Sequence, residues 1–368
     1  MTLDHTLTKQ STHGYIKTQP VSHSPIPRHP LSSIFRSRPS VSACEMRCHS
    51  LAKLLVLPGL AWAASHCNTT QHRQSQLTIS APATRSLQLA LFIKNAEVDF
   101  FRRLSSTVET TSPSNITGAD LESISTQDQI QRDALRRILD AAGEDPVQPC
   151  TYSSPPGDWA ASVSAGSRLK SIGASANLGI AESIAATDAT LLPGVLAMAA
   201  TEARHDAVMA AADGRPASPT AFDTAIPEEW AFNLALGSVV SGTCPSLPAL
   251  PVVPGLSAQL SGGGGGGGGS GGGGGSGGGG GVTCSFSWDP EQAAASIESP
   301  KPLFIAWVNQ LAAPVYTSLA VTSPGNGTAS PPGGMAGSVF AVLTSQDEAT
   351  TVAELAGYTL AGPAYLSI

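Results

Sequence analysis

The sequence predicts an α+β protein: an antiparallel four-helix bundle with a short fifth helix, followed by a small antiparallel, sandwich-like β domain. Two observations carry this prediction. Hydrophobic residues recur with a helical period between residues 81 and 240, and with a period of two after residue 284. Between these regions, residues 262–281 are glycine except for Ser270 and Ser276. Such a run behaves as a flexible coil, so residues 257–282 are predicted to be a linker.

The helical region contains four long segments, each with an apolar stripe along one face. Helices with such stripes bury them against one another, which predicts a bundle over residues 81–256. A shorter fifth helix is expected after Pro227, through Leu236. The four long segments are Thr84–Leu104, Ser123–Ala142, Asp158–Ile184 and Pro193–Ala212.

The β domain is predicted over residues 283–368, where short alternating runs are separated by Gly- and Pro-rich turns. This region has no histidine, no CxxC motif and no phosphate-binding loop, so no chemistry is predicted for it. The strand-like runs are VTCSFSW, LFIAWVN, VYTSLAV, SVFAVLT and AYLSI.

The N-terminal region carries a secretory signal in an unusual place. A basic start, an apolar run and Ala61-Trp62-Ala63 follow Met46, which predicts a signal peptide over residues 46–63. Residues 1–45 are rich in Ser, Pro and His, and we interpret them as a disordered product of an over-extended gene model. Residues 64–80 are then a linker. The chain is accordingly expected to be secreted, either extracellular or in the cell wall.

A mitochondrial presequence is the alternative for residues 1–45, because basic residues outnumber acidic ones there. The many prolines in this stretch disfavour the amphipathic helix that such a presequence needs.

Cysteine usage agrees with secretion. Cleavage after Ala63 leaves four cysteines, an even set suited to an oxidising compartment. Cys150 and Cys244 follow separate helical segments and are expected to pair, although three connectivities are open. Acceptor triplets for N-glycosylation support the same compartment. The remaining cysteines are Cys67 and Cys284, and the acceptors are Asn68, Asn115 and Asn326.

Composition limits the partners. The net charge of −7 argues against a general nucleic-acid-binding protein, which would show a basic stripe. No stretch is long and apolar enough for a predicted membrane span. The cell wall is the one partner suggested, and the oligomeric state is left open.

The segment TEARH places Glu202 and His205 three residues apart, on one face of the fourth helix. A carboxylate and an imidazole in this arrangement are candidate metal ligands.

Five segments together resemble the ferritin-like domain of secreted stress- and desiccation-related proteins of fungi and plants. The end of the chain resembles the β tail of the fungal members. The segments are LQLALFIKNAEVDFF, QPCTY, TEARH, AFDTAI and GTCP, and the tail is GSVFAVLTSQ with AGPAYLSI.

The resemblance implies a bundle related to di-iron carboxylate proteins, with a Glu from each of two helices and Glu-x-x-His from each of the other two. Iron or manganese would suit such donors. The first and fourth helices supply Glu97, Glu202 and His205, which we take as a residual metal site. The second and third helices place Gln131, Ala134 and Lys170 at the other expected positions. Asp128, Asp133 and Glu182 offer oxygen atoms, but none stands at an expected position.

Two features argue against a complete di-metal centre. His205 is the only histidine after residue 72. In addition, Lys170 could replace the charge of a metal, since buried carboxylates need a cation or a proton. We therefore predict a Glu97–Lys170–Glu202–His205 polar cluster, with Lys94 or Arg204 near its rim.

The expected function is that of a secreted, stress-associated ferritin-like protein with a degenerate di-iron site and a non-catalytic structural or protective role. No cofactor is expected. The alternative is a metal-binding oxidoreductase or iron-binding protein that uses the reduced site. Enzymatic activity is therefore left open, with the balance against it.

Overall fold

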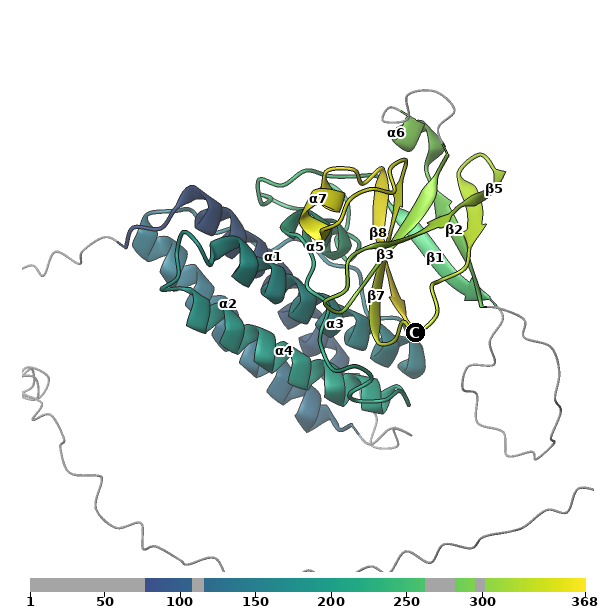
Figure 1. Cartoon of the computed structure of the whole chain (residues 1–368). Helices are drawn as coiled ribbons and strands as arrows, with labels where there is room; N and C mark the ends of the chain where they lie inside the picture. The colour runs from purple at the N-terminus through teal and green to yellow at the C-terminus, as the bar shows by residue number, and fades with distance from the viewer. Residues whose placement is uncertain (1–76, 108–115, 262–281, 295–301) are drawn as a thin grey trace, which may run out of the picture. The chain divides into compact units, whose positions relative to one another are not determined.

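The computed structural model describes residues 77–107, 116–261, 282–294 and 302–368. Within them it confirms the α+β fold: four long helices and a short fifth, followed by antiparallel sheets (Figure 1). The predictions for residues 1–45, the signal peptide, Cys67, Asn68, Asn115 and the glycine run lie outside the described residues, as does most of the 64–80 linker.

The long helices agree with the predicted segments to within a few residues, except that the second starts earlier, at Gly118. That earlier start is set by a capping box, in which Thr117 and Asp120 bond each other's backbone N–H groups. Gly143, in a left-handed conformation, ends the same helix. The helices are α1 (Ala81–Ser105), α2 (Gly118–Ala142), α3 (Trp159–Ile184), α4 (Leu192–Ala212) and the short α5 (Glu228–Leu236).

Small residues on α3 allow its neighbours to approach closely. A Cβ at Gly179 would lie 1.8 Å from the carbonyl oxygen of Ile226, in the segment before α5. Glycine at this position therefore lets the two backbones meet. A disulfide between Cys150 and Cys244, as predicted, ties the segment after α2 to the segment after α5.

The β region has two four-stranded antiparallel sheets. The first sheet has the order β1-β2-β6-β5, and the second has the order β4-β3-β7-β8. The strands are β1 (Leu256–Ser261), β2 (Thr283–Trp288), β3 (Phe304–Asn309), β4 (Val315–Ser318), β5 (Ala320–Ser323), β6 (Asn326–Ala329), β7 (Ser338–Thr344) and β8 (Ala361–Ser367). Two short helices, α6 (Pro290–Ala294) and α7 (Val352–Ala356), complete the elements.

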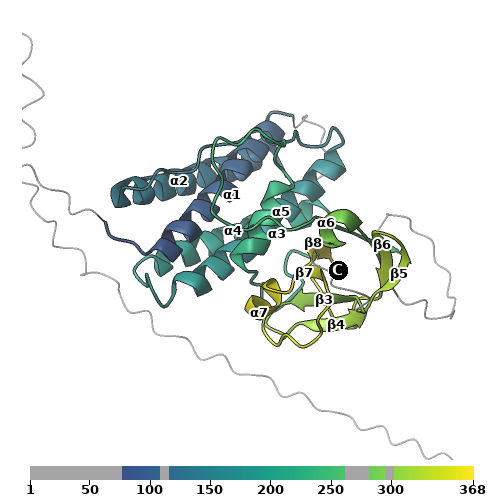
Figure 2. The same cartoon turned by 90° about the horizontal axis from the view of Figure 1, so that it is seen from above.

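The second sheet is covered on both faces. Ile305 and Trp307 of β3 pack against the first sheet, where the Phe286 and Trp307 rings meet edge to face at 5.7 Å. Ala306 and Val308, on the opposite face of β3, belong to the same apolar core as the helices. Helix α5 contacts both α3 and β8 (Figure 2). The helical and β regions therefore share a core.

Two details of the β region differ from the sequence-based expectation. Strand β1 occupies residues 256–261, where the linker was predicted to begin, because its backbone pairs with β2 from Leu256↔Trp288 to Ser261↔Thr283. The run VTCSFSW is therefore the second strand of a pair, and residues 262–281 lie between two adjacent strands. The run VYTSLAV forms two strands in different sheets, because the chain crosses from β4 to β5 at Leu319.

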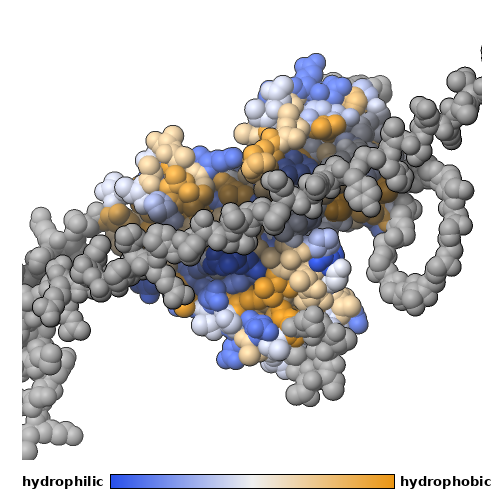
Figure 3. Space-filling view, turned by 60° about the horizontal axis from the view of Figure 1, so that its bottom comes forward, coloured by the Kyte–Doolittle hydropathy of each residue, from blue (hydrophilic) through white to orange (hydrophobic). Residues whose placement is uncertain are grey.

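Polar and apolar residues both reach the surface on the face drawn in Figure 3. Exposed apolar side chains include Ile130, Leu196 and Val208. None of the described helices combines the length and hydropathy needed to cross a membrane.

Candidate functional site

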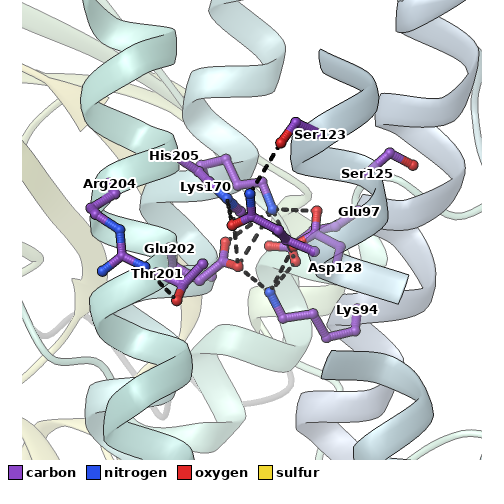
Figure 4. A network of polar contacts seen from close by, with 12 residues as sticks. Lys94, Glu97, Ser123, Ser125, Asp128, Lys170, Thr201, Glu202, Arg204 and His205 are labelled. Carbon is purple, nitrogen blue, oxygen red and sulfur yellow. Dashed lines mark hydrogen bonds and ion pairs between the residues drawn. The ribbon is translucent and has the colours of Figure 1, made fainter. Parts of the chain in front are cut away.

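Charged side chains from all four long helices converge in the middle of the bundle (Figure 4). We call Lys94, Glu97, Asp128, Lys170 and Glu202 the charged cluster. Each of these side chains is at most 1 % exposed to solvent. Helix α1 contributes Lys94 and Glu97, which share a face at i, i+3, and one residue comes from each of α2, α3 and α4.

The ammonium group of Lys94 joins three carboxylates. Its Nζ donates to Glu97 Oε2 at 2.6 Å and to Asp128 Oδ1 at 3.2 Å. It also donates to Glu202 Oε1. All three donors of this ammonium are therefore used inside the bundle.

The ammonium group of Lys170 contacts the same three carboxylates. Its Nζ donates to Asp128 Oδ2 at 2.6 Å and lies 3.3 Å from Glu97 Oε2 and 3.1 Å from Glu202 Oε2. The ring of Phe101 lies 4.8 Å from the same nitrogen, close enough for a cation–π interaction. Two ammonium groups thus bridge three buried carboxyl groups.

Burial and charge act in opposite directions on these groups. Burial alone would lower the pKa of both lysines, but the three carboxylates raise it, so both stay charged. Burial also favours the neutral form of Glu202, but Lys170 and Lys94 outweigh it and lower the pKa of Glu202. Burial and the nearby Glu202 charge raise the pKa of Glu97 to about 8. With Glu97 protonated at neutral pH, two positive and two negative charges remain in the charged cluster.

His205 lies at the edge of the charged cluster. Its Nε2 is 3.1 Å from Gln127 Oε1, which can only accept from an N–H. Burial and the charge on Lys170 lower the pKa of His205 to about 4, so the ring is neutral and Nδ1 carries a lone pair. This Nδ1 has no hydrogen-bond partner and lies 3.9 Å from both Asp128 Oδ1 and Glu202 Oε1.

Gly173 on α3 leaves room for two carboxylates. A Cβ at this position would lie 2.4 Å from Glu97 Oε1 and 2.9 Å from Glu202 Oε2. Neither of these two oxygens accepts a hydrogen bond from the described residues. Glu202 Oε2 does form an ion pair with Lys170 Nζ, at 3.1 Å. Only a glycine at position 173 therefore leaves space for the Glu97 and Glu202 carboxyl groups in this part of the bundle.

Of the predicted Glu97–Lys170–Glu202–His205 cluster, the first three members are joined by the ion pairs of Lys170. His205 lies beside them, with its Nδ1 3.9 Å from Glu202 Oε1. Lys94 was placed near the rim and instead lies at the centre, because its side chain is long enough to reach across from α1 to α4. Arg204 does not take part. It lies on the surface of α4 and donates to Thr201 and to the backbone of Ala200.

Asp128 is the member of the charged cluster that sequence reasoning misplaced. The expected pair on α2 was assigned to positions 131 and 134, whereas the inward acid lies one turn earlier. The sequence carried a signal for it, because Asp128 lies at helical spacing from Leu121, Ile124 and Leu135, which are among the buried residues of α2. Asp133 and Glu182, the other acids considered, do not reach the cluster.

Two metal ions do not fit these residues. The bundle offers one imidazole, since His205 is the only histidine after residue 72. In addition, Lys94 and Lys170 already bind the carboxylate oxygens of Asp128 and Glu202 that would have to act as metal ligands. A single ion has a better donor set: Asp128, Glu202 and His205 offer ligand atoms within 4.8 Å of one another, of the kind that suits iron or manganese. Lys94 contacts both of the carboxylate oxygens nearest His205, so it would have to move.

Residues 83–215 match the family model described as the ferritin-like domain. The match spans α1 to α4, and with it every residue of the charged cluster and His205. The helical part of the chain is thus a ferritin-like domain, as the resemblance of its segments indicated. No curated protein matches the chain.

Proposed function

We propose that the protein is a secreted, non-catalytic ferritin-like scaffold with a structural or protective role, of the kind associated with stress or drying. The observation that supports this most is the pair of buried ammonium groups, Lys94 and Lys170, each bound to the three carboxyl groups of the charged cluster. In a di-iron protein, metal ions would neutralise such carboxylates. Here the chain supplies the positive charge itself, so the fold does not need a metal to neutralise its core.

The charged cluster also lacks what redox chemistry at two metals needs. Its carboxylate oxygens are engaged by lysines, and one neutral imidazole stands where two are expected. A stable scaffold makes different demands: buried charges must be paired, and their hydrogen bonds must be largely satisfied. The contacts of Lys94 and Lys170 meet these demands.

Secretion is supported by two features of the described residues. Cys150 and Cys244 form a disulfide, and structural disulfides persist in oxidising compartments. Asn326, in an Asn-Gly-Thr triplet, is exposed at the start of β6 and can be reached by a glycosylating enzyme. N-terminal sequencing and mass measurement of the chain recovered from culture medium test this proposal. A chain found only inside cells and without glycan would contradict it.

Metal analysis tests the non-catalytic scaffold. The full chain is incubated anaerobically with ferrous iron, passed through a desalting column and analysed for iron, and its thermal midpoint is measured before and after. We expect no retained iron and an unchanged midpoint, because a ligand stabilises only the state that binds it. Two retained irons per chain, or oxygen consumption with ferrous iron, would overturn the proposal. Lys170→Glu, which returns a carboxylate to α3, is the matched variant in which iron retention should increase.

A single-metal site is the second candidate function, favoured by the converging donors of Asp128, Glu202 and His205. It predicts one bound Mn²⁺ or Fe²⁺ per chain and a raised thermal midpoint. His205→Gln should abolish both effects, whereas Gln131→Ala should leave them in place.

A further inference from the structure

A second site lies outside the charged cluster, in a pocket of about 590 Å³ where α3 and the end of α5 meet the β region. Its volume falls in the range of pockets that hold small molecules. Arg168 lines the pocket on the helical side, and Ser257, Ser287 and Trp288 line it on the side of the first sheet. No residue of the charged cluster contributes to it.

Among the residues that the structure describes, Arg168 makes no hydrogen bond or ion pair. Its guanidinium carbon lies over the ring of Tyr365, 5.9 Å from the ring centroid. Arg168 is exposed to solvent, although the protein around its guanidinium lowers the pKa of that group. A partly desolvated cation is stabilised by a carboxylate or phosphate that replaces the lost water.

The aromatic support of Arg168 is itself held in place. The hydroxyl of Tyr365 donates to Ser171 Oγ at 3.0 Å, and its ring meets Phe340 edge to face at 5.8 Å. A cation–π contact with a fixed ring holds the guanidinium near this position, and its N–H fork stays available for a bidentate contact.

The sheet side of the pocket adds neutral hydrogen-bonding groups. Ser257 and Ser287 are directly opposite each other on β1 and β2, both are exposed, and neither hydroxyl has a partner among the described side chains and backbone groups. Asp289 is the acid of the pocket, but its carboxylate caps α6 by accepting from the N–H groups of Glu291 and Gln292. The guanidinium of Arg168 is therefore the charged group of the pocket that is available to a ligand, together with the hydroxyl groups of Ser257 and Ser287.

We propose that this pocket binds a carboxylated sugar, such as a uronic acid or a short oligomer of one. Arg168 would hold the carboxylate through its fork, and the hydroxyls of Ser257 and Ser287 would bond the hydroxyls of the sugar ring. A planar carboxylate matches the guanidinium geometry, whereas a simple apolar acid would leave the two serines unused. The site does not depend on the scaffold function proposed above, because it shares no residue with the charged cluster.

Calorimetric titration of the full chain with tri-galacturonate tests the proposal. The matched ligand is the methyl ester of the same trimer, which keeps the sugar and removes the charge. We expect saturable binding of the acid and at least tenfold weaker binding of the ester. Inorganic phosphate, titrated at the same concentration, should bind more weakly than the acid. Equal binding of acid and ester, phosphate binding as tight as that of the trimer, or no binding of the trimer would each overturn the proposal.

Variants of the same chain locate the site. Arg168→Gln should weaken binding of the acid at least tenfold, and Ser287→Ala should weaken it two- to fivefold. Arg137→Gln removes the same charge from an exposed position on α2 and should leave the affinity within twofold. If Arg137→Gln and Arg168→Gln weaken binding equally, the effect is one of net charge and the pocket is not the site. Circular dichroism melts of each variant confirm that it is folded.

Discussion

The bundle core and the β core are stabilised in different ways. The middle of the bundle contains five ionisable side chains, each at most 1 % exposed. The core between the two sheets is apolar, with Ile305, Trp307 and Leu343 fully buried, and the described strands bury no charged side chain. An apolar core loses stability in proportion to the atoms removed, whereas a buried charged core fails when its charges no longer balance. Substitutions of similar size should therefore have different consequences in the two regions.

The largest loss is expected from Lys94→Met, which keeps the length of the side chain and removes its charge. One ammonium would then be left with two carboxylates and the protonated Glu97, and breaking a buried ion pair costs about 3–5 kcal/mol. Urea unfolding monitored by circular dichroism measures this loss. Lys94→Met combined with Glu202→Gln should recover part of it, because the charges balance again. If Lys94→Met alone were as stable as the surface control Arg137→Met, the bundle core would not depend on its charge balance.

Leu343→Ala is the corresponding test in the β core. The loss should be about 2–5 kcal/mol, from lost apolar contacts and the cavity left behind. Burial raises the pKa of the Cys284 thiol in this core to about 11, so the thiol stays neutral and the loss should be the same at pH 5.5 and pH 8.5. Leu311→Ala, at a side chain that is 70 % exposed, should cost little. A strong pH dependence for Leu343→Ala would show that the two cores are coupled.

Gly173→Ala tests how tightly the charged cluster is held. The new Cβ would meet Glu97 Oε1 and Glu202 Oε2, whose carboxyl groups the lysines hold through Glu97 Oε2 and Glu202 Oε2, and such overpacking costs about 1–3 kcal/mol. Gly166→Ala, on the same helix, is the matched control. Its Cβ would meet the flexible end of Met209 at 2.7 Å, and alanine favours helix by up to about 1 kcal/mol. Equal effects of the two substitutions would mean that the carboxylates can move.

The last test is a gradual decline in stability with rising pH. The pKa of Glu97 is raised from 4.5 to about 8, so between these values the unfolded chain releases a proton that the folded chain keeps. Stability therefore falls as pH rises, by at most about 1.4 kcal/mol per pH unit. His205 acts in the opposite direction: its pKa is lowered from 6.5 to about 4, so its contribution rises with pH between those values.

The two trends oppose each other below pH 6.5, and only the Glu97 trend remains between pH 6.5 and pH 8. Unfolding free energies measured across that interval should fall in the parent chain and stay level in Glu97→Gln. His205→Gln should retain the decline. A level profile in the parent chain would contradict the assignment of a proton to Glu97.

The helices could be predicted because their signal is local. The stripe of Val195, Met198, Glu202, His205 and Met209 is present in the sequence at helical spacing, and all five side chains are buried. The sheets were less predictable, because strand pairing joins distant residues. Strand β1 has a weak pattern of its own and is defined by its partner β2, and nothing local marks Leu319 as a crossing between sheets.

The charged cluster was predictable in part for a similar reason. Glu97, Lys170 and Glu202 could be placed by counting along helices of known register. Asp128 was named as an oxygen donor but left out of the cluster, because the expected positions on α2, 131 and 134, begin about one turn later. The central place of Lys94 depends on how far a flexible side chain extends between helices, and helical spacing carries no information about that reach.

The pairing of Ser261 with Thr283 has a practical consequence for protein engineering. The chain leaves β1 and re-enters β2 at neighbouring points, so the cost of closing whatever lies between grows only slowly with its length. A reporter domain with adjacent termini could replace the glycine tract without pulling the two strands apart. The same position would also accept new chain ends in a circular permutant.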